Sequence, residues 1–182
     1  AMENNVVRLL NARHATRAML PDKLPAGIVE DLLEAVRLTP SCFNNQPWRF
    51  LFLESHDALS KGEQFFSKGN WQWASRAPLV VIGYSRAAND CAMKDGREYH
   101  HFDLGMAVMN LILAATGHGL VARPMAGFDP AKVKELFGLE EPDKPLVVIA
   151  IGKKSDDDSH VPEYARGADR KPRERKTAAE IV

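Results

Sequence analysis

The segment FDLGMAVMNLILAAT, residues 102–116, is the strongest helix in the sequence and anchors the interpretation of the whole chain. It is apolar almost throughout, and small residues such as Gly105 and Ala107 would let neighbouring elements pack closely against it. Gly117 and Gly119 follow directly and are expected to end the helix. The sequence therefore predicts a central buried helix at this position.

Short apolar runs lie on both sides of this helix and predict strands. PLVVIGY at residues 78–84 precedes it, and PLVVIAIG at residues 145–152 follows it. The remaining predicted elements are strands at 48–53 and from 120 onward, and helices at 4–11, 26–38, 56–68 and 131–137. Because helices and strands alternate, we expect one domain over residues 1–182, with helices on both faces of a sheet.

Composition favours an ordinary globular protein and excludes several classes. Of 182 residues, 45% are hydrophobic and 26% are charged, and 24 basic residues balance 24 acidic ones. An anion site must therefore be local. The two cysteines, Cys42 and Cys91, suggest neither a disulfide framework nor a paired metal motif, and they suit a reducing compartment. With no signal-like start and no apolar run long enough to cross a bilayer, we expect a cytoplasmic protein.

Two segments near the N-terminus concentrate polar groups that a core does not need. In residues 13–17, RHATR, two arginines four positions apart repel each other unless an anion lies close, although a helix end also favours cations. In residues 40–48, PSCFNNQPW, hydroxyl and amide side chains are enclosed by two prolines. Such a loop can recognise the edge of a planar polar ligand, or it is simply a turn before a strand.

Two further segments lie in the second half of the chain. Residues 123–128, RPMAGF, follow a predicted strand, and Gly127 permits close approach of a ligand to the backbone. Residues 166–176 hold six basic and two acidic residues, which suits a phosphate, a solvated tail or weak nucleic-acid binding. The tail at 162–182 lacks the apolar periodicity needed to form its own core, so we expect it to pack on something else.

Other site classes find little support in the sequence. The chain contains no G-x-G-x-x-G, Walker or G-x-S-x-G motif. His100, His101 and Asp103 form the nearest approach to a metal motif, but no other ligand cluster accompanies them, so no metal is expected. Trp71 and Trp73 lack interleaved basic residues and are interpreted as packing residues. We therefore expect neither a metal nor a nucleic-acid partner.

Taken together, the four segments resemble the FMN-dependent nitroreductase family, in the same order and at similar spacing. The family pattern R-[RH]-S-x-[RK] is matched at residues 13–17, and P-S-x-x-N-x-Q-P-W is matched at residues 40–48. The central helix with its G-[LF]-x-x-x-P-x-x-G-F continuation resembles residues 103–128, and the basic C-terminal segment resembles residues 173–182. The resemblance covers the chain from Val6 to Val182.

The resemblance implies an α+β fold, a three-layer α-β-α sandwich with a central mixed sheet. It also implies an intertwined homodimer in which residues 162–182 pack as an extended tail on the partner subunit. Two equivalent FMN sites would lie at the interface, and NADH or NADPH would be the electron donor. The reaction would be ping-pong, with the nicotinamide leaving before a nitroaromatic, quinone or similar small acceptor binds over the same ring face. No membrane partner is implied.

The resemblance further implies which residues bind FMN. Arg13, Arg173 and Arg175 would hold the phosphate and ribityl chain, and Arg17 would lie near the N1 and C2 carbonyl edge of the ring. A backbone N–H of residues 124–127 would approach N5. The complete expected set is Arg13, His14, Ala15, Arg17, Pro40, Ser41, Cys42, Asn44, Gln46, Asn70, Pro124, Met125, Ala126, Gly127, Arg173 and Arg175, with Ser41, Asn44 and Gln46 coming from the partner subunit. The flavin carries the chemistry, so no catalytic side chain is expected.

Two departures and two alternatives accompany this interpretation. Ala15 replaces the family serine, and the chain is short between Gly62 and Pro78, where longer members cover the flavin. One alternative keeps the fold but changes the reaction to reductive dehalogenation or dehydrogenation. The other is a non-catalytic flavin-binding or nucleic-acid-binding protein, since a fold does not fix a reaction.

Overall fold

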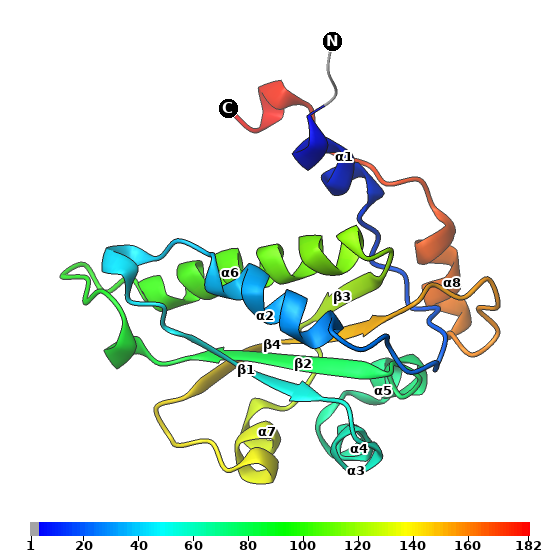
Figure 1. The fold of residues 1–182 in the computed structure, drawn as a ribbon, viewed down its shortest axis with the longest axis horizontal. Coiled ribbons are helices and arrows are strands. Elements are labelled where there is room, and N and C mark those ends of the chain that lie inside the picture. The colour runs from blue at the N-terminus through cyan, green and yellow to red at the C-terminus, as the bar shows by residue number, and fades with distance from the viewer. Residues whose placement is uncertain (1–3) are drawn as a thin grey trace.

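The computed structural model describes residues 4–182 and shows a four-stranded sheet between two layers of helices (Figure 1). The strands are β1 (Trp48–Leu53), β2 (Leu79–Ser85), β3 (Val121–Met125) and β4 (Lys144–Gly152), in the spatial order β1-β2-β4-β3. The three-layer α+β architecture is confirmed. The expected mixed sheet is wrong for the described residues, because all three strand pairs are antiparallel. The apolar pattern predicts where strands lie in the sequence, but it does not predict whether neighbouring strands run parallel or antiparallel.

The two helical layers bury both faces of the sheet. In Figure 1, α2 (Ile28–Arg37) and α6 (Tyr99–Gly117) lie on one face. The opposite face carries α3 (His56–Ser60), α4 (Gly62–Phe65), α5 (Lys68–Ala74) and α7 (Pro130–Phe137). This double coverage explains why β2 is buried along nearly its whole length instead of alternating. Helix α6 is the central helix predicted from residues 102–116, and Leu104 and Leu111 on it are completely buried.

The single helix predicted for residues 56–68 is instead two short helices, α3 and α4, and a third, α5, begins at Lys68. Ser55 caps α3 by accepting a hydrogen bond from the Ala58 N–H, and Ser67 caps α5 in the same way through Asn70. Between them, Phe66 has an extended backbone. The side chains of serines compete for helical N–H groups, so each serine starts a new helix. The expected packing role of the tryptophans holds, because Trp73 is buried in the core and Trp71 packs against it.

Both ends of the chain carry elements that leave apolar or charged surface exposed. Helix α1 (Asn5–Ala12) has no buried residue, although its apolar residues form one stripe. The C-terminal segment was expected to be extended from residue 162. Instead, α8 (Glu163–Arg170) forms there and buries Ala165 in the core of the same chain. Every residue from Lys171 to Val182 is exposed. Three short 3-10 turns complete the fold: η1 (Cys42–Asn44), η2 (Ala87–Asn89) and η3 (Ala178–Glu180).

Within residues 4–182, none of the helices combines the length and the hydropathy needed to span a membrane.

Candidate functional site

A basic cavity lies where the segment after α1 meets the C-terminal segment. Its volume is about 350 Å³. Six cationic side chains and a single carboxylate, that of Asp169, are among the described residues that line it. The cationic residues are Arg13, Arg17, Arg123, Lys171, Arg173 and Arg175. In a chain with no net charge, this local excess of positive charge identifies an anion site.

The cations in this cavity are crowded enough to perturb one another. Burial and the positive charges of Arg173 and Arg175 hold the pKa of Arg13 below its ordinary value. The pKa of His14 is likewise lowered, first by burial and then by Arg173, Lys154 and Arg13. Both shifts mean that the charged forms are disfavoured in the protein alone. An anion bound among these groups would relieve the repulsion, and that relief would contribute to its affinity.

Arg173 connects the tail to α1. Its guanidinium donates to the main-chain oxygens of Arg13 at 2.7 Å, Asn11 at 2.8 Å and Leu10 at 3.3 Å. These carbonyls belong to the C-terminal end of α1, where helical carbonyls lack partners. The sequence predicted a phosphate ligand at Arg173, and the structure adds a second role in fixing the tail against α1. Arg175 does not fix the tail in this way, because within residues 4–182 its side chain donates to the neighbouring Glu174 carbonyl.

Arg17 is paired with Asp169, which the sequence analysis missed. The Arg17 guanidinium forms a salt bridge to the Asp169 carboxylate, and the Arg17 main-chain N–H donates to the same carboxylate at 2.8 Å. The two side chains are only 17% and 14% exposed. An acidic residue inside a basic run was the available signal, because an isolated carboxylate among cations usually pairs with one of them. The pair fixes α8 on the segment that follows α1.

Arg123 is a second residue that the expected site lacked. It projects from β3, donates to the Ala15 carbonyl and lies over the Trp73 ring, with 5.7 Å between the guanidinium carbon and the ring centroid. Burial lowers the pKa of Arg123 first, and the charge of Arg17 lowers it further. Arg123 thereby joins β3 to residues 13–17. Arg123 is the first residue of the RPMAGF segment, which the sequence singled out, but Arg123 was not included in the expected site.

The expected Asn70 and 124–127 segments also meet in the structure. The Asn70 side-chain amide donates to the Gly127 carbonyl at 2.9 Å, and the Ser67 N–H donates to the same oxygen at 3.1 Å. A Cβ atom on Gly127 would lie 2.6 Å from the Asn70 amide nitrogen, so this approach requires glycine. Pro124 and Met125 lie in β3, and Ala126 and Gly127 follow it in an exposed turn. Three of the four sequence segments therefore lie at one end of the molecule (Figure 1).

The loop at residues 40–46 lies at the opposite end of α6. The Cys42 N–H donates to Asp103 near the start of α6, whereas β3 follows the end of that helix at Gly117. At about 1.5 Å of rise per residue, these two points on α6 are about 20 Å apart. Figure 1 shows the loop beyond the end of α2 that lies away from α8. Ser41, Asn44 and Gln46 of one chain are therefore not brought to the basic cavity of the same chain.

The loop itself has an unusual backbone. Phe43, Asn44 and Gln46 have φ values of 47°, 58° and 49°, in the left-handed region. Such conformations cost about 1–3 kcal/mol each for ordinary residues, although Asn adopts them more readily. Local hydrogen bonds support the loop, with the Ser41 hydroxyl accepting from the Gln46 N–H at 2.9 Å. Strain of this kind concentrates at ligand-binding sites.

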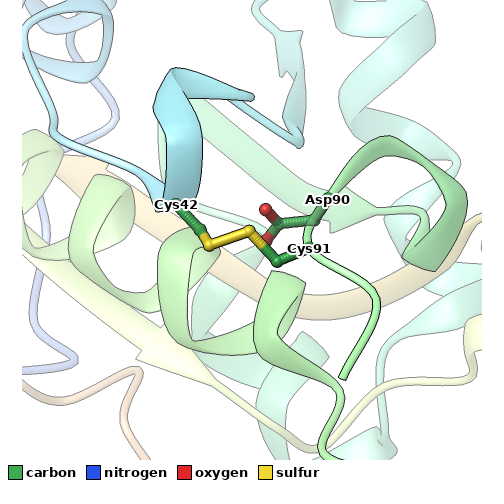
Figure 2. A group of neighbouring side chains, drawn as sticks. All are labelled: Cys42, Asp90 and Cys91. Carbon is green, nitrogen blue, oxygen red and sulfur yellow. A yellow bond between two sulfur atoms is a disulfide. The ribbon is translucent and has the colours of Figure 1, made fainter. Parts of the chain in front are cut away.

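The expectation that the cysteines do not form a disulfide is wrong in this structure. Cys42 and Cys91 are joined, with their Cα atoms 6.2 Å apart and 49 residues between them in sequence (Figure 2). The packing of the 40–46 loop beside the segment before α6 brings the two together. Two isolated cysteines with such a separation form no recognisable spacing motif, so only the tertiary structure reveals the pair.

Among residues 4–182, two groups of side chains have a spacing that suits a metal. One comprises Cys42, Asp90 and Cys91, and its sulfurs form the disulfide. The other comprises Glu98, His100 and His101. In that group, Nδ1 of His100 lies 2.7 Å from the Ser85 hydroxyl and Glu98 pairs with Lys144. Asp103, which the sequence grouped with the histidines, accepts from Cys42 instead.

A family model decides the relationship of this chain to known proteins. The model described as the nitroreductase family matches residues 10–153, which include residues 13–17, residues 40–48 and the strand that carries Arg123. The chain belongs to the nitroreductase family. The resemblance inferred from four short segments is thereby confirmed.

Relatives within the nitroreductase family extend over most of the chain. A Stenotrophomonas maltophilia protein, with the provisional name NADH dehydrogenase/NAD(P)H nitroreductase, is 31% identical over 71% of this chain and 75% of its own length. The Bacillus subtilis protein YdgI, provisionally an NAD(P)H nitroreductase, is 26% identical over 85% and 90%. A solved oxidoreductase containing FMN is 26% identical, with a TM-score of 0.85, and covers 100% of this chain and 92% of its own.

A further nitroreductase-type structure shares the fold. The protein from Exiguobacterium sibiricum, solved in complex with FMN, has a TM-score of 0.78 and 20% identity, and covers 100% of this chain and 98% of its own. The three-layer arrangement of Figure 1 is thus the arrangement of the nitroreductase family.

Proposed function

We propose that this nitroreductase-family protein is an FMN-dependent NAD(P)H oxidoreductase that reduces nitroaromatics, quinones or similar small acceptors. The observation that carries the proposal is the basic cavity, where residues 13–17 and 166–176 supply five cations and one carboxylate and β3 supplies Arg123. FMN, when bound, supplies the redox chemistry by taking electrons from the nicotinamide and passing them to the acceptor. The names of the Stenotrophomonas and Bacillus relatives support the nicotinamide donor.

The residues present fit FMN at both of its ends. Arg13, Arg173 and Arg175 offer guanidinium groups to a phosphate, and burial together with the positive charges of Arg173 and Arg175 lowers the pKa of Arg13. Beyond β3, Ala126 and Gly127 are exposed, and Asn70 donates to the Gly127 carbonyl. Arg17 also lines the cavity, and we assign it to the ring edge. An FMN-containing relative at 26% identity supports this assignment.

A shared site in a homodimer accounts for the position of the 40–46 loop. Ser41, Asn44 and Gln46 are too far from the cavity of their own subunit, so the partner subunit would supply them. The exposed apolar residues Val6, Val7 and Leu10 on α1 give the subunit a surface to bury in such a dimer. Leu33 on α2 and Phe102 on α6 are also exposed, and all three helices lie on one side of the sheet in Figure 1.

The exposed tail fits the same assembly. Residues 171–182 are wholly exposed in the single chain and end in Ile181 and Val182, at 73% and 108% exposure. Apolar residues at the end of an exposed segment are stabilised when they pack on another surface. We propose that the segment beyond Arg175, and not the whole of 162–182, packs on the partner subunit, since Arg173 and Arg175 line the cavity of their own chain.

The protein's own residues would bind and orient FMN and would not transfer protons. Arg13, His14, Arg173 and Arg175 would hold the phosphate, while Ala15 leaves one hydrogen bond fewer than the family serine would give. No side chain is assigned as a catalytic acid or base. Specificity for the acceptor would come from the shape of the exposed ring face, which is less covered because the chain is short between Gly62 and Pro78.

Purification tests the proposed function directly. The protein should bind FMN in a ratio of one per subunit, show the absorbance of oxidised flavin, and lose that absorbance when NADH or NADPH is added. A nitroaromatic or a quinone should then restore it. Protein that binds no FMN after incubation with excess cofactor, or whose flavin does not respond to either nicotinamide, would refute the proposal.

Arg17 and Asp169 should shift the flavin potential in opposite directions. Because flavin gains negative charge near N1 on reduction, a guanidinium there favours the reduced form. We expect Arg17→Ala to lower the midpoint potential by about 20–60 mV, since one charge interaction contributes roughly 1–3 kcal/mol and 30 mV corresponds to about 1.4 kcal/mol for two electrons. Asp169→Asn releases Arg17 from its salt bridge and should raise the potential.

A redox titration of FMN-saturated variants measures both effects. The two substitutions break the same salt bridge, so each serves as the control for the other. A shared shift of the same sign would indicate that loss of the salt bridge disturbs the fold, and unchanged potentials would show that Arg17 lies away from the ring.

A further inference from the structure

The disulfide joins the loop that carries the second family motif to a segment outside it. Cys42 lies within residues 40–46, and Cys91 lies between η2 and α6 (Figure 2). Both residues are partly exposed, so a thiol reagent can reach the bond. These are also the only two cysteines in the sequence, so no third thiol competes for either partner. A partly exposed disulfide of this kind is open to thiol–disulfide exchange.

Most hydrogen bonds of the 40–46 loop lie within the loop, so few contacts besides the disulfide join it to the segment before α6 and to α6 itself. On the Cys91 side, the Asn45 side-chain amide reaches Asp90 at only 3.4 Å and the Cys91 sulfur at 3.7 Å. On the α6 side, the Cys42 N–H donates to the Asp103 carboxylate at 2.9 Å. Against these contacts, Phe43, Asn44 and Gln46 all have left-handed backbones. Once the covalent link is cut, the strained residues can relax to more populated conformations.

We propose that Cys42 and Cys91 form a thiol–disulfide exchange site at which a dithiol reductant weakens FMN binding by releasing the 40–46 loop. The inference rests on the proposed function, because it describes how FMN binding at the same site is regulated. One thiolate of the reductant attacks a sulfur of the pair, the Cys42–Cys91 bond breaks, and a mixed disulfide forms. The second reductant thiol displaces the remaining protein sulfur. The protein gains two electrons and two protons as two thiols, and the reductant leaves as its disulfide.

The Asp90 side chain affects how fast the disulfide exchanges with thiols. Ligand atoms of Asp90, Cys42 and Cys91 all lie within 4.8 Å of one another, and Figure 2 shows the carboxyl group beside the two sulfurs. A carboxylate there repels an attacking thiolate and disfavours the thiolate that must leave. Asp90 would therefore slow the reduction of the bond. Asp90→Asn should be reduced severalfold faster by the same dithiol.

The experiment compares the full-length FMN-bound protein before and after treatment with dithiothreitol. Thiol titration of the denatured protein should find none before treatment and two after it. The dissociation constant for FMN, from flavin fluorescence, should rise at least tenfold on reduction. Cys91→Ser should bind FMN as weakly as reduced wild type, with or without dithiothreitol. Ala92→Ser, a matched change at the adjacent exposed residue, should behave like wild type.

Hydrogen exchange separates this inference from the proposed function. Amides of residues 41–46 should exchange faster after reduction, a readout that needs no FMN. Two free thiols in untreated protein, or equal FMN affinity in the two confirmed redox states, would overturn the inference while leaving the proposed function standing. Absence of FMN binding in every form would reject the proposed function, and the exchange data would then show whether the disulfide still controls the loop.

Discussion

Replacing both Arg173 and Arg175 with alanine is expected to lower the affinity for FMN roughly a hundredfold or more. Both guanidinium groups line the basic cavity, and a hydrogen bond to a charged group typically contributes about 1.5–3 kcal/mol. Loss of two such bonds amounts to about 3 kcal/mol at the lower limit, and each 1.4 kcal/mol is a factor of ten. The flavin should then be lost during purification.

Riboflavin provides the control for this expectation. It lacks the phosphate, so wild type and double variant should bind it about equally. If the variant loses both ligands, the arginines act through the dimer or the fold and not through the phosphate. If FMN binding is unchanged, residues 171–176 are a solvated surface.

The single variants separate the two roles that the structure gives to this pair. Arg173→Ala also removes three hydrogen bonds to the carbonyls at the end of α1, whereas Arg175→Ala removes none of these. We therefore expect Arg173→Ala to lower the melting temperature as well as the FMN affinity. Arg175→Ala should lower the affinity alone, which makes it the cleaner test of phosphate binding.

Mixed dimers are expected to recover one FMN site where the parent variants have almost none. Arg13→Ala removes a cavity residue, and Asn44→Ala removes a residue of the 40–46 loop. If each site combines the cavity of one subunit with the loop of the other, a dimer of these two variants places both defects in one site. The second site then contains wild-type Arg13 and wild-type Asn44, so FMN should bind in a ratio of one per dimer.

Two affinity tags on co-expressed subunits allow the mixed dimer to be isolated and its FMN content measured. The matched control combines Arg13→Ala with Arg175→Ala, which line the same cavity. That pairing leaves no intact site and should bind little FMN. If the Arg13 and Asn44 dimer also binds none, each site lies within a single subunit and the shared-site proposal is refuted.

Local sequence patterns predicted most of the elements because their causes are local. The strand at 48–53 matches β1 at both ends, and the helix at 102–116 lies within α6. Clustered charge at residues 13–17 and 166–176 left an anion site and a solvated surface both open, and the structure brings the two segments together around the basic cavity. Local rules failed for 56–68, where the expected helix breaks after Ser60 and again at Phe66, before Ser67 caps α5. They failed again for α8, whose single buried residue, Ala165, gives almost no apolar period.

The partners of the site residues were beyond prediction because they are distant in sequence. Arg17 and Asp169 are 152 residues apart, and Arg173 reaches carbonyls more than 150 residues away. Nothing in the spacing of Cys42 and Cys91 indicates that they meet. Such contacts depend on how α6, α8 and the strands pack against one another. That packing depends on many residues acting together.

The sequence by itself therefore indicated the family, most of the elements and the basic segments that we propose bind FMN. Apolar period, turn residues and local charge act over a few positions, and a single sequence displays them directly. Only the tertiary structure decided the antiparallel sheet, the Arg17–Asp169 pair, the Cys42–Cys91 bond and the distance between the two halves of the proposed site. These features arise when segments far apart in the chain are packed together, and the free energy of that packing belongs to the whole core and to no single segment.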